Sequence, residues 1–380
     1  MAKRRRAGAA GWLSDYCLTA ARYQRSPFAG RRNPLPEKVL ITGGAGFLGC
    51  YLARRLLRDG CAVTLFDVAP LDAADLIGHV RFERGDVRDR ARVQEVVRGH
   101  DGVIHAAAAL PIQRTRRRIY SVNITGTRHV LDACLAHGVE RVVYVSSTAV
   151  YGVPKALPET EESPLDPIGY YGESKVAGER LCARYGQRGL AVNVLRPKTF
   201  LGPERLGVFE LWFEAIYSGK RVYLLGDGTN RYQLLAVVDV VDALVRALNS
   251  AIYGETFNVG ASQFGTWRSD LGAVIRYAGS RSKLTGLPVR PAQAVLALLE
   301  WLGLSPIAAW HYLTMPADSY IAIDKAERLL GWHPTQSNVE LLVESYQWYA
   351  EHRAEMLHKV GATHRVGWNF QVLDLVRWLP

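Results

Sequence analysis

The sequence predicts an α/β fold in which a doubly wound parallel sheet is followed by a smaller, interleaved C-terminal domain. Short β-branched runs alternate with amphipathic stretches from residue 38 to about residue 259. The runs are apolar on both faces, as strands covered by helices on both sides are. After Gly202 the alternation fades, and turns containing Pro or Gly become frequent.

The individual elements follow from length and composition. Two amphipathic stretches, Leu48–Asp59 and Asn123–Gly138, have helical spacing and end at or just before a glycine, as helices commonly do. Six β-branched segments have the length of strands. They are Lys38–Thr42, Ala62–Asp67, Val80–Asp86, Gly102–Ala108, Arg141–Ser147 and Ala191–Pro197.

A glycine-rich turn, TGGAGFLG, joins the first predicted strand to the first predicted helix. Gly43 permits a tight turn, Gly46 lets the backbone approach a pyrophosphate, and Gly49 lets helix and strand touch. The helix begins at Phe47 and Leu48, where free N–H groups and the positive end of the helix dipole favour an anion. The pattern predicts a Rossmann-type dinucleotide site.

Asp67 ends the second predicted strand and selects the cofactor. A carboxylate there accepts hydrogen bonds from the adenosine ribose hydroxyls and repels the 2′-phosphate of NADP. The next residues, Val68 and Ala69, supply no Arg to receive such a phosphate. The sequence therefore predicts NAD. Asp86 and Val87, after the third strand, would lie near the adenine, although Asp86 taken alone is equally typical of a turn.

Tyr171 and Lys175 stand four residues apart, on one face of a predicted helix. A tyrosine ordinarily titrates near pH 10, and a nearby ammonium group favours the phenolate. The spacing alone is more often two surface residues. Here Ser147 ends the fifth strand about 25 residues earlier, downstream of the dinucleotide motif. Ser147 could hold a substrate oxygen while Tyr171 moves its proton and NAD takes the carbon-bound hydride.

These motifs, in this order, resemble the extended short-chain dehydrogenase/reductase family, in particular its NAD-dependent epimerase/dehydratase branch. The resemblance covers about residues 38–350. The matching segments are Thr42–Gly49, His105–Ala108, Asn123–Thr127, Ser146–Gly152, Tyr171–Lys175, Leu195–Pro197, Gly226–Arg231, Val237–Ala243, Phe257–Gly260 and Lys325–Pro334.

The resemblance implies roles for individual residues. Tyr171 would be the acid/base, Lys175 would tune it and hold the nicotinamide ribose, and Ser147 would be the catalytic hydroxyl. Thr148 could share the role of Ser147. The family also implies homodimers that pack the helix around residues 114–137 and the helix of Tyr171 against their mates. Three further residues would contact the cofactor: Ala106, Ala107 and Asn123.

The substrate is less clearly indicated. In nucleotide-sugar members of the family an Arg at the position of Arg231 contacts the diphosphate. Epimerisation would be the simplest reaction, and a 4,6-dehydratase is disfavoured because Thr148-Ala149 stand where that class has Asp-Glu. Against a nucleotide sugar, Thr199 replaces a usual Asn, and a second diphosphate Arg is missing from residues 314–318.

Two alternatives stay open. The apolar segment Pro291–Tyr312 would suit a sterol or other lipid alcohol, oxidised with net NADH formation by an enzyme like 3β-hydroxysteroid dehydrogenase. An NAD-sensing scaffold without catalysis is the other. The expected organisation has four parts: a basic extension (1–36), an NAD-binding domain (37–202 plus 235–261), a substrate-binding domain (203–234 plus 262–350) and an amphipathic tail (351–380).

Composition excludes several classes. With 48% hydrophobic and 22% charged residues, the chain has the composition of a soluble globular protein. Residues 1–38 supply seven of the eleven net positive charges, so the folded part gives no case for nucleic-acid binding. The five cysteines show no CxxC spacing, which fits a reducing cytoplasm and predicts neither disulfides nor a metal site.

The ends of the chain leave one question about partners. If residues 366–379 are helical, an apolar stripe on that helix could rest on an anionic membrane surface together with the basic head. Packing against its own domain or a dimer mate is the commoner explanation. No apolar run is long enough to predict a spanning helix. The stripe consists of Trp368, Val372, Leu375, Val376 and Leu379.

Overall fold

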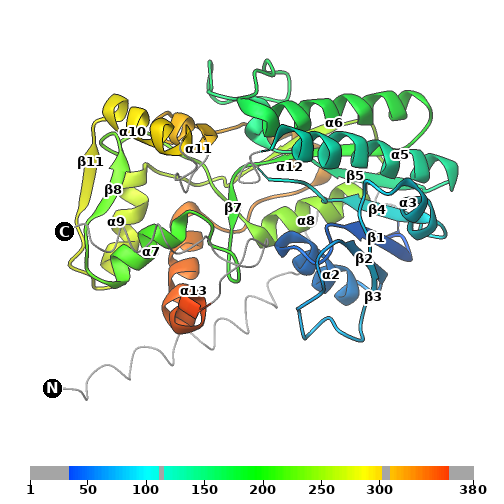
Figure 1. The fold of residues 1–380 in the computed structure, drawn as a ribbon, viewed down its shortest axis with the longest axis horizontal. Helices are drawn as coiled ribbons and strands as arrows, with labels where there is room; N and C mark the ends of the chain where they lie inside the picture. The colour runs from blue at the N-terminus through cyan, green and yellow to red at the C-terminus, as the bar shows by residue number, and fades with distance from the viewer. Residues whose placement is uncertain (1–33, 111–114, 302–308, 359–380) are drawn as a thin grey trace.

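A seven-stranded parallel sheet organises the computed structural model, which describes residues 34–110, 115–301 and 309–358 (Figure 1). This confirms the predicted doubly wound sheet. The strand order reverses between β1 and β4, as is typical of such sheets. In spatial order the strands are β10 (Thr256–Val259), β6 (Val192–Pro197), β5 (Arg141–Val145), β4 (Gly102–His105), β1 (Lys38–Thr42), β2 (Ala62–Asp67) and β3 (Arg81–Arg84).

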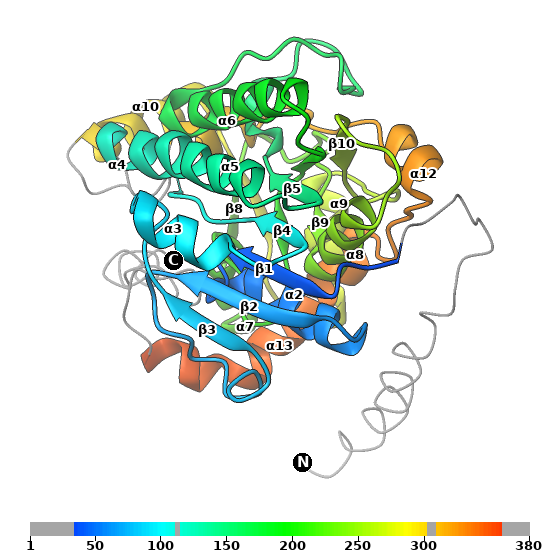
Figure 2. The same ribbon diagram turned by 90° about the vertical axis from the view of Figure 1, so that its right-hand side faces the viewer.

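Helices cover both faces of the sheet (Figure 2). Each helix layer buries its own apolar cluster against the strands, which is why the strands are apolar on both sides. On one face lie α3 (Arg90–Val97), α4 (Arg116–Tyr120), the π-helix η2 (Ser121–Gly126), α5 (Thr127–Ala136) and α6 (Gly169–Gln187). On the other lie α2 (Phe47–Arg58), α8 (Val237–Leu248) and α12 (Asp324–Leu330).

Three strands end before the residue that their sequence pattern predicts. β3, β4 and β5 end at Arg84, His105 and Val145, so the polar or small residues that follow them belong to loops. After β5, the side chain of Ser147 caps the short 3₁₀-helix η3 (Thr148–Val150) instead of continuing the strand. Because all seven strands are parallel, these loops meet at one edge of the sheet.

A second, smaller group of elements packs beside this edge, around an apolar cluster of its own. It draws on the segments 203–234 and 262–350 that the sequence sets apart. Its elements are α7 (Phe209–Tyr217), β8 (Val222–Leu225), α9 (Trp267–Tyr277), β11 (Leu284–Leu287), α10 (Val289–Trp301), α11 (Ala309–Thr314) and α13 (Asn338–His358). Two short strands, β7 (Phe200–Leu201) and β9 (Leu235–Ala236), pair where the chain passes between the groups.

The helix α13 continues past residue 350, where we expected the tail to begin. Tyr349 donates a hydrogen bond to Glu214 of α7, and Arg353 donates to both oxygens of the same carboxylate, at 2.7 and 2.8 Å. Residues 351–356 therefore belong to the smaller group. The predicted apolar stripe within residues 366–379 lies outside the described residues.

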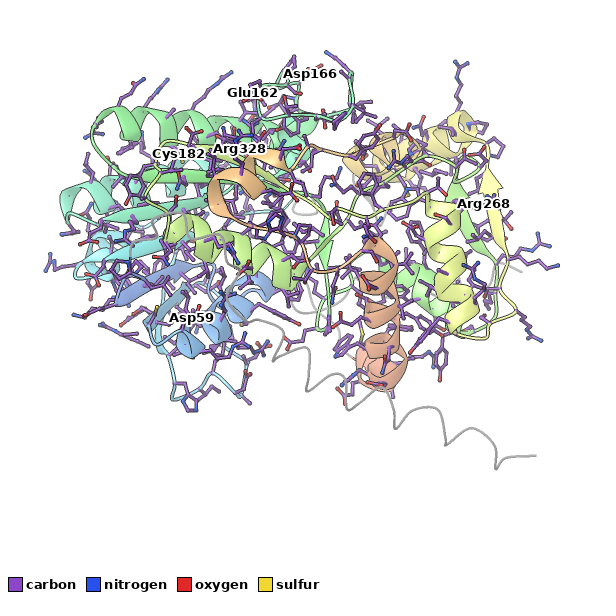
Figure 3. All side chains as sticks on the ribbon, turned by 180° about the vertical axis from the view of Figure 1, so that it is seen from behind. Asp59, Glu162, Asp166, Cys182, Arg268 and Arg328 are labelled. Carbon is purple, nitrogen blue, oxygen red and sulfur yellow. The ribbon has the colours of Figure 1, made fainter. Side chains whose placement is uncertain are left out.

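Figure 3 shows the two groups from behind, with Asp59 at the end of α2 and Arg268 on α9 at opposite ends of the molecule. Side chains fill the region between the groups. The four described cysteines, Cys50, Cys61, Cys134 and Cys182, are all buried in the sheet domain. Within the described ranges no helix combines the length and apolar character needed to cross a bilayer.

Candidate active site

The glycine-rich turn lies between β1 and α2, at the carboxyl edge of the sheet. Gly43 has a φ of 73°, and a Cβ there would lie 2.8 Å from the backbone nitrogen of Ala107. A Cβ on Gly49 would lie 2.5 Å from the carbonyl oxygen of Gly43. Both positions therefore require glycine. The turn therefore packs closely against the backbone that follows β4.

The start of α2 has the properties of an anion site. Gly46 caps the helix and offers no side-chain hydrogen bond, so the N–H groups of Phe47 and Leu48 have no capping partner. No acidic residue stands in the first turn of the helix. The side chains of Phe47 and Leu48 are buried in the core, which fixes the helix end in place. These features fit the pyrophosphate of a dinucleotide.

Asp67 lies against this turn at the end of β2. One carboxylate oxygen accepts a hydrogen bond from the N–H of Ala45 at 3.1 Å, and the other accepts from Ala69 at 3.0 Å. Burial raises the pKa of Asp67, and these backbone hydrogen bonds oppose the rise. A carboxylate held beside the glycine-rich turn fits the adenosine ribose hydroxyls.

Asp86 and Val87 follow β3 and differ in environment. Asp86 is half-buried and pairs with Arg88, at 2.5 Å between Oδ2 and Nη2, and this hydrogen bond lowers the pKa of Asp86. Val87 is buried, and a Cβ on Gly126 would lie 2.6 Å from its Cγ2. Asp86 thus holds its own turn, while Val87 packs the loop against the helix layer.

The residues after β4 join the turn to the rest of the site. Ala106 donates to the carbonyl of Thr42 at 3.1 Å, and Ala107 donates to the Thr42 hydroxyl at 3.3 Å. The Thr42 hydroxyl also contacts Nδ1 of His105 at 2.6 Å, and Nε2 of His105 lies 2.9 Å from the Thr127 hydroxyl. Burial lowers the pKa of His105 to about 3. His105 is therefore neutral and links β1, β4 and α5.

Asn123 holds the site together from inside. Its Oδ1 accepts from the N–H of Ala109, and its Nδ2 donates to the Ala109 carbonyl and to the Ser174 hydroxyl at 2.9 Å. Both amide donors are used within the protein, and Asn123 is 1% exposed. It therefore connects the loop after β4 to α6, between the two catalytic candidates on that helix.

Tyr171 and Lys175 lie on α6 beside Ser147. Burial raises the pKa of Tyr171 to about 12, and both a hydrogen bond with Ser147 and the positive charge of Arg205 oppose the rise. Lys175 lies with Nζ 5.8 Å from the centre of the Tyr171 ring and donates to the carbonyl of Val145 at 2.7 Å. Burial lowers the pKa of Lys175 to about 8. The ammonium group of Lys175 is directed at the Val145 carbonyl, and its predicted effect on Tyr171 stays a prediction.

A buried network supports this end of α6. Glu179, two turns after Tyr171, accepts two hydrogen bonds from Arg196 at 2.9 and 2.7 Å and one from Ser146 at 2.5 Å. Arg196 also donates to the Tyr151 hydroxyl at 2.8 Å. Sequence reasoning missed Glu179. Two features of the sequence could have indicated it. Glu179 lies on the same helical face as Lys175, and Arg196 is a charged residue inside an otherwise apolar strand.

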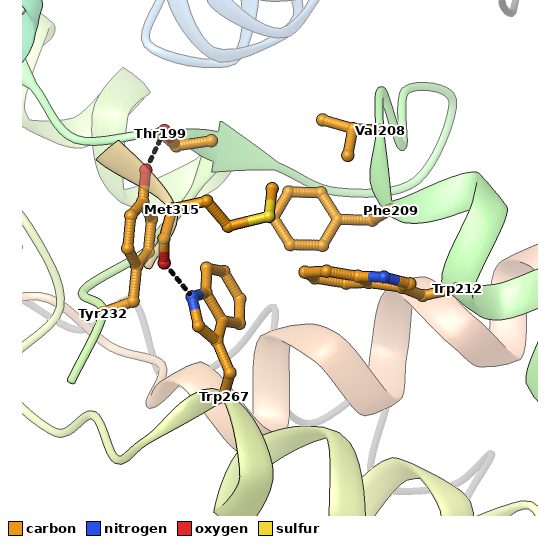
Figure 4. A pocket seen from close by; sticks show the side chains of 7 residues that line it. All are labelled: Thr199, Val208, Phe209, Trp212, Tyr232, Trp267 and Met315. Carbon is orange, nitrogen blue, oxygen red and sulfur yellow. Dashed lines mark hydrogen bonds between the residues drawn. The ribbon is translucent and has the colours of Figure 1, made fainter. Parts of the chain in front are cut away.

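The residues predicted to contact substrate are dispersed. Thr148 is buried and its hydroxyl donates to the Pro197 carbonyl at 3.4 Å, so Ser147 is the hydroxyl that faces Tyr171. Thr199 lies 3.4 Å from the Tyr232 hydroxyl, at the rim of a pocket in the smaller group (Figure 4). The pocket is lined by Thr199, Val208, Phe209, Trp212, Tyr232, Trp267 and Met315.

Arg231 is exposed and stacks between two rings. Its guanidinium lies 4.7 Å from the centre of Phe264 and 5.0 Å from that of Tyr320. Its backbone N–H donates to Asp318 at 2.6 Å. Planar stacking leaves the edge of the guanidinium for an anion. Sequence reasoning did not anticipate these two rings, which lie about 33 and 89 positions away in the chain.

Two more charged groups near this edge escaped the sequence analysis. Lys198 is buried, donates to the Ser319 hydroxyl at 2.6 Å and lies over the Tyr232 ring. Glu159 is also buried, and burial raises its pKa to about 7. Among the described residues, no three His, Cys, Asp or Glu side chains gather as a metal site would require.

Comparison with known proteins places this geometry in context. Residues 39–260 match a family model described as the NAD dependent epimerase/dehydratase family. The protein named y4nG of Sinorhizobium fredii is 37% identical, over 90% of this chain and 85% of its own length. A dTDP-glucose 4,6-dehydratase of Streptomyces niveus is 30% identical, over 83% and 94%. A UDP-glucose 4-epimerase of Lactobacillus helveticus is 29% identical, over 83% and 98%.

Solved structures show the same architecture. The UDP-glucose 4-epimerase of Thermotoga maritima superposes with a TM-score of 0.71 at 24% identity, covering 83% of this chain and 99% of its own. This likeness concerns the fold. It covers both the seven-stranded sheet and the smaller group beside its carboxyl edge.

Proposed function

The chain belongs to the NAD-dependent epimerase/dehydratase family and uses NAD, and from this premise we propose that it epimerises a nucleotide sugar, with Tyr171 as the acid/base. The observation that carries the proposal is the placement of Tyr171, Ser147 and Lys175 at the sheet edge, beside a glycine-rich turn that fits a dinucleotide. Bound NAD supplies a reversible hydride acceptor for a carbon of the sugar.

The residues of this chain would hold and move the proton. Ser147 fixes the oxygen of the reacting carbinol, and Tyr171 accepts its proton as the ketone forms and returns it afterwards. The burial that raises the pKa of Tyr171 to about 12 opposes its action as a base. Positive charge at the site therefore has to lower that pKa in the complex. Lys175, which donates to the Val145 carbonyl, would bind the nicotinamide ribose.

Epimerisation is favoured over dehydration by the two residues after Ser147. A 4,6-dehydratase needs a second acid and base there, and this chain has Thr148 and Ala149, both buried and without a carboxylate. Epimerisation needs only one acid/base and room for the ketone to turn. The lipid-alcohol alternative is not proposed, because the named relatives carry the names of nucleotide-sugar enzymes.

The proposal is tested with NAD-saturated protein and UDP-, dTDP- and GDP-hexoses. Products are resolved by NMR, with absorbance at 340 nm followed in parallel. An epimeric nucleotide sugar without accumulated NADH, and with its carbon-bound hydrogen retained in D₂O, supports the proposal. A 4-keto-6-deoxy product would replace it with dehydration, and stoichiometric NADH would replace it with net oxidation.

A further inference from the structure

Lys198 is a buried cation at the junction between the sheet and the smaller group. It directly follows the last residue of β6, and its backbone N–H donates to the carbonyl of Val259 in β10 at 3.0 Å. The residue is 3% exposed. Burial lowers the pKa of its ammonium group to about 8, and the charge of Glu159 opposes the fall. A buried ammonium group is unfavourable unless protein groups or an opposite charge replace the lost water.

The ammonium group of Lys198 contacts two residues from paired segments of the chain. Its Nζ donates to the Ser319 hydroxyl at 2.6 Å and lies 4.9 Å from the centre of the Tyr232 ring. Ser319 and Tyr232 form a parallel bridge. The N–H of Ser319 donates to the Arg231 carbonyl at 2.9 Å, and its carbonyl accepts from Gln233 at 3.0 Å. Lys198 therefore connects both paired segments to the end of β6.

The other side of these paired segments carries Arg231. Successive side chains of an extended segment point to opposite sides, so Arg231 and Tyr320 face away from Lys198. Tyr320, directly after Ser319, has its ring centre 5.0 Å from the Arg231 guanidinium. Asp318, directly before Ser319, accepts the backbone N–H of Arg231 at 2.6 Å. Ser319 thus stands between two residues that hold Arg231.

A second connection runs through Glu159, in the loop between η3 and α6. Its N–H donates to the Tyr320 carbonyl at 3.1 Å, and its carbonyl accepts from Ala322 at 2.8 Å. Glu159 is buried, and its side chain supplies the negative charge that favours the ammonium form of Lys198. The segment that contains Ser319 and Tyr320 is therefore attached to the sheet domain at Lys198 and at Glu159.

We propose that Lys198 is a positioning residue for the substrate diphosphate, because it fixes the segments that carry Arg231 to the domain that carries Tyr171. This inference rests on the proposed function and on the predicted contact of Arg231 with the diphosphate. Lys198 acts through Arg231 and lies on the opposite side of the paired segments. Residues 314–318 contain no second Arg for that anion, so binding depends more on where Arg231 lies. A cation that is held in place before the ligand arrives loses less freedom on binding.

The test measures the binding of UDP, dTDP and GDP to the NAD-saturated protein by calorimetry, which requires no turnover. Lys198→Met removes the ammonium group and should raise the Kd of the nucleotide that binds by about tenfold, as for coupled neighbours. The Kd of NAD, at a separate site, should stay within about twofold. Ser319→Ala should give part of the loss, whereas Ser319→Thr keeps the hydroxyl and should bind like the wild type. With a nucleotide hexose that turns over, KM should rise and kcat should change much less.

A double-mutant cycle with Arg231→Gln separates positioning from general support of the fold. In the Arg231→Gln background, adding Lys198→Met should change the nucleotide Kd by less than about twofold, because the group that Lys198 positions is already gone. Lys283→Met, at an exposed position before β11, is the matched control and should change nothing. If Lys198→Met does not fold, Ser319→Ala and Ser319→Thr carry the same cycle.

Three results would overturn the inference. Nucleotide binding that is unchanged in Lys198→Met or in Ser319→Ala would show that this contact does not position Arg231. An equal loss with and without Arg231→Gln would show that Lys198 supports the fold in general. Either result would leave the proposed function intact. Failure of UDP, dTDP and GDP to bind the wild-type chain would remove the proposed function, and this inference with it.

Discussion

At the scale of single residues, the site brings together groups whose titration depends on their surroundings. Burial raises the pKa of Tyr171 to about 12 and lowers the pKa of Lys175 to about 8. Both shifts disfavour the charged form of the side chain. In the protein without ligand, Tyr171 is therefore a phenol at neutral pH. It becomes a useful base only when ligand charges and hydrogen bonds lower its pKa.

Replacing Tyr171 with Phe removes the hydroxyl and leaves the ring. We expect kcat to fall by about a thousandfold or more, since a positioned acid/base contributes about 10²–10⁴-fold. NAD binding should change by less than about twofold, because the start of α2 and Asp67 are untouched. Steady-state kinetics and NAD titration measure the two effects separately. Retained turnover in Tyr171→Phe would rule out this tyrosine as the acid/base.

Replacing Asp67 with Asn keeps an oxygen to accept the Ala45 N–H and removes the charge. The preference for NAD over NADP should fall by about tenfold or more, because the repulsion of the 2′-phosphate is lost (~1.4 kcal/mol per tenfold). Fluorescence titration with both cofactors gives the ratio. Val68→Asn, at an exposed neighbouring position, serves as the control. An unchanged ratio in Asp67→Asn would contradict the assignment of Asp67 to the ribose.

Sequence patterns were sufficient for residues whose role follows from spacing. Gly43, Gly49, Tyr171 and Lys175 were predicted because a strand, a turn or a helical period dictates where they lie. The role of Lys198 could not be predicted in this way. Its contact with Ser319 joins residues 121 positions apart in the chain, and no periodic pattern encodes it.

At the scale of elements, two substitutions of Glu204 separate the effect of its positive φ from the effect of its contact with Arg54. Glu204→Gly should lose the Arg54 contact but relieve the backbone, whereas Glu204→Ala should lose the contact and keep the strain. Glu204→Ala should therefore be the less stable variant by about 1–2 kcal/mol. Urea unfolding of both variants measures the difference. Equal stabilities would mean that the positive φ costs nothing here.

Element boundaries were less predictable than element positions. β1 and β2 have the predicted bounds, but the stretch Asn123–Gly138 divides into the end of a π-helix and α5. The irregularity coincides with Asn123, whose side-chain amide forms hydrogen bonds with Ala109 and Ser174 instead of facing solvent. A hydrophobic pattern records which face of a helix is buried. It does not record a side chain that bonds two other segments.

The elements of the smaller group were harder still to predict from the hydrophobic pattern. Its apolar cluster combines α7, α9 and α13, which are separated by long intervals in the sequence. The alternation that revealed the sheet is absent there, so the sequence indicated a second unit without indicating its helices. The apolar segment Pro291–Tyr312 contributes α10 and the start of α11. The sequence pattern showed that this segment is apolar but not that it divides into two helices.

At the scale of the whole molecule, buried carboxyl groups set the pH dependence of stability. Burial raises the pKa of Glu159 and Glu210 to about 7 and that of Asp239 to about 6. Between pH 5 and pH 7.5 the folded chain therefore binds more protons than the unfolded chain, and stability falls as pH rises. Burial lowers the pKa of His105 to about 3, so this group opposes the fall in part, but it is one group against three carboxyl groups. Glu214, whose pKa Arg353 lowers to about 2, stays ionised throughout this window and does not oppose the trend.

Glu159→Gln should reduce this fall, by about 3 kcal/mol at most, since one pKa unit corresponds to about 1.36 kcal/mol. Urea unfolding at pH 5 and pH 7.5 gives the change in free energy of unfolding for the wild type and the variant. Glu95→Gln, at an exposed position on α3, is the control. A wild-type chain that becomes more stable from pH 5 to pH 7.5 would contradict the raised pKa values.

The family implies a homodimer, and the surface of α5 and α6 is the face we expect to form it. Ala183 is exposed on α6, away from Tyr171 and Lys175. Ala183→Glu should place a charge in the centre of such an interface and shift the chain towards the monomer. Light scattering after size-exclusion chromatography measures the mass. Val153→Glu, on an exposed loop, is the control, and a monomeric wild type would remove the prediction.

The four buried cysteines of the sheet domain are natural probes for the exposure of each face of the sheet. Burial raises the pKa of the Cys134 and Cys182 thiols, so while the sheet is closed both are protonated and shielded from an alkylating reagent. Cys50 and Cys61 pack against the opposite face of the same sheet. Mass spectrometry after timed alkylation during unfolding would therefore give the rate at which each face becomes exposed. It would show whether the two helix layers leave the sheet together or one after the other.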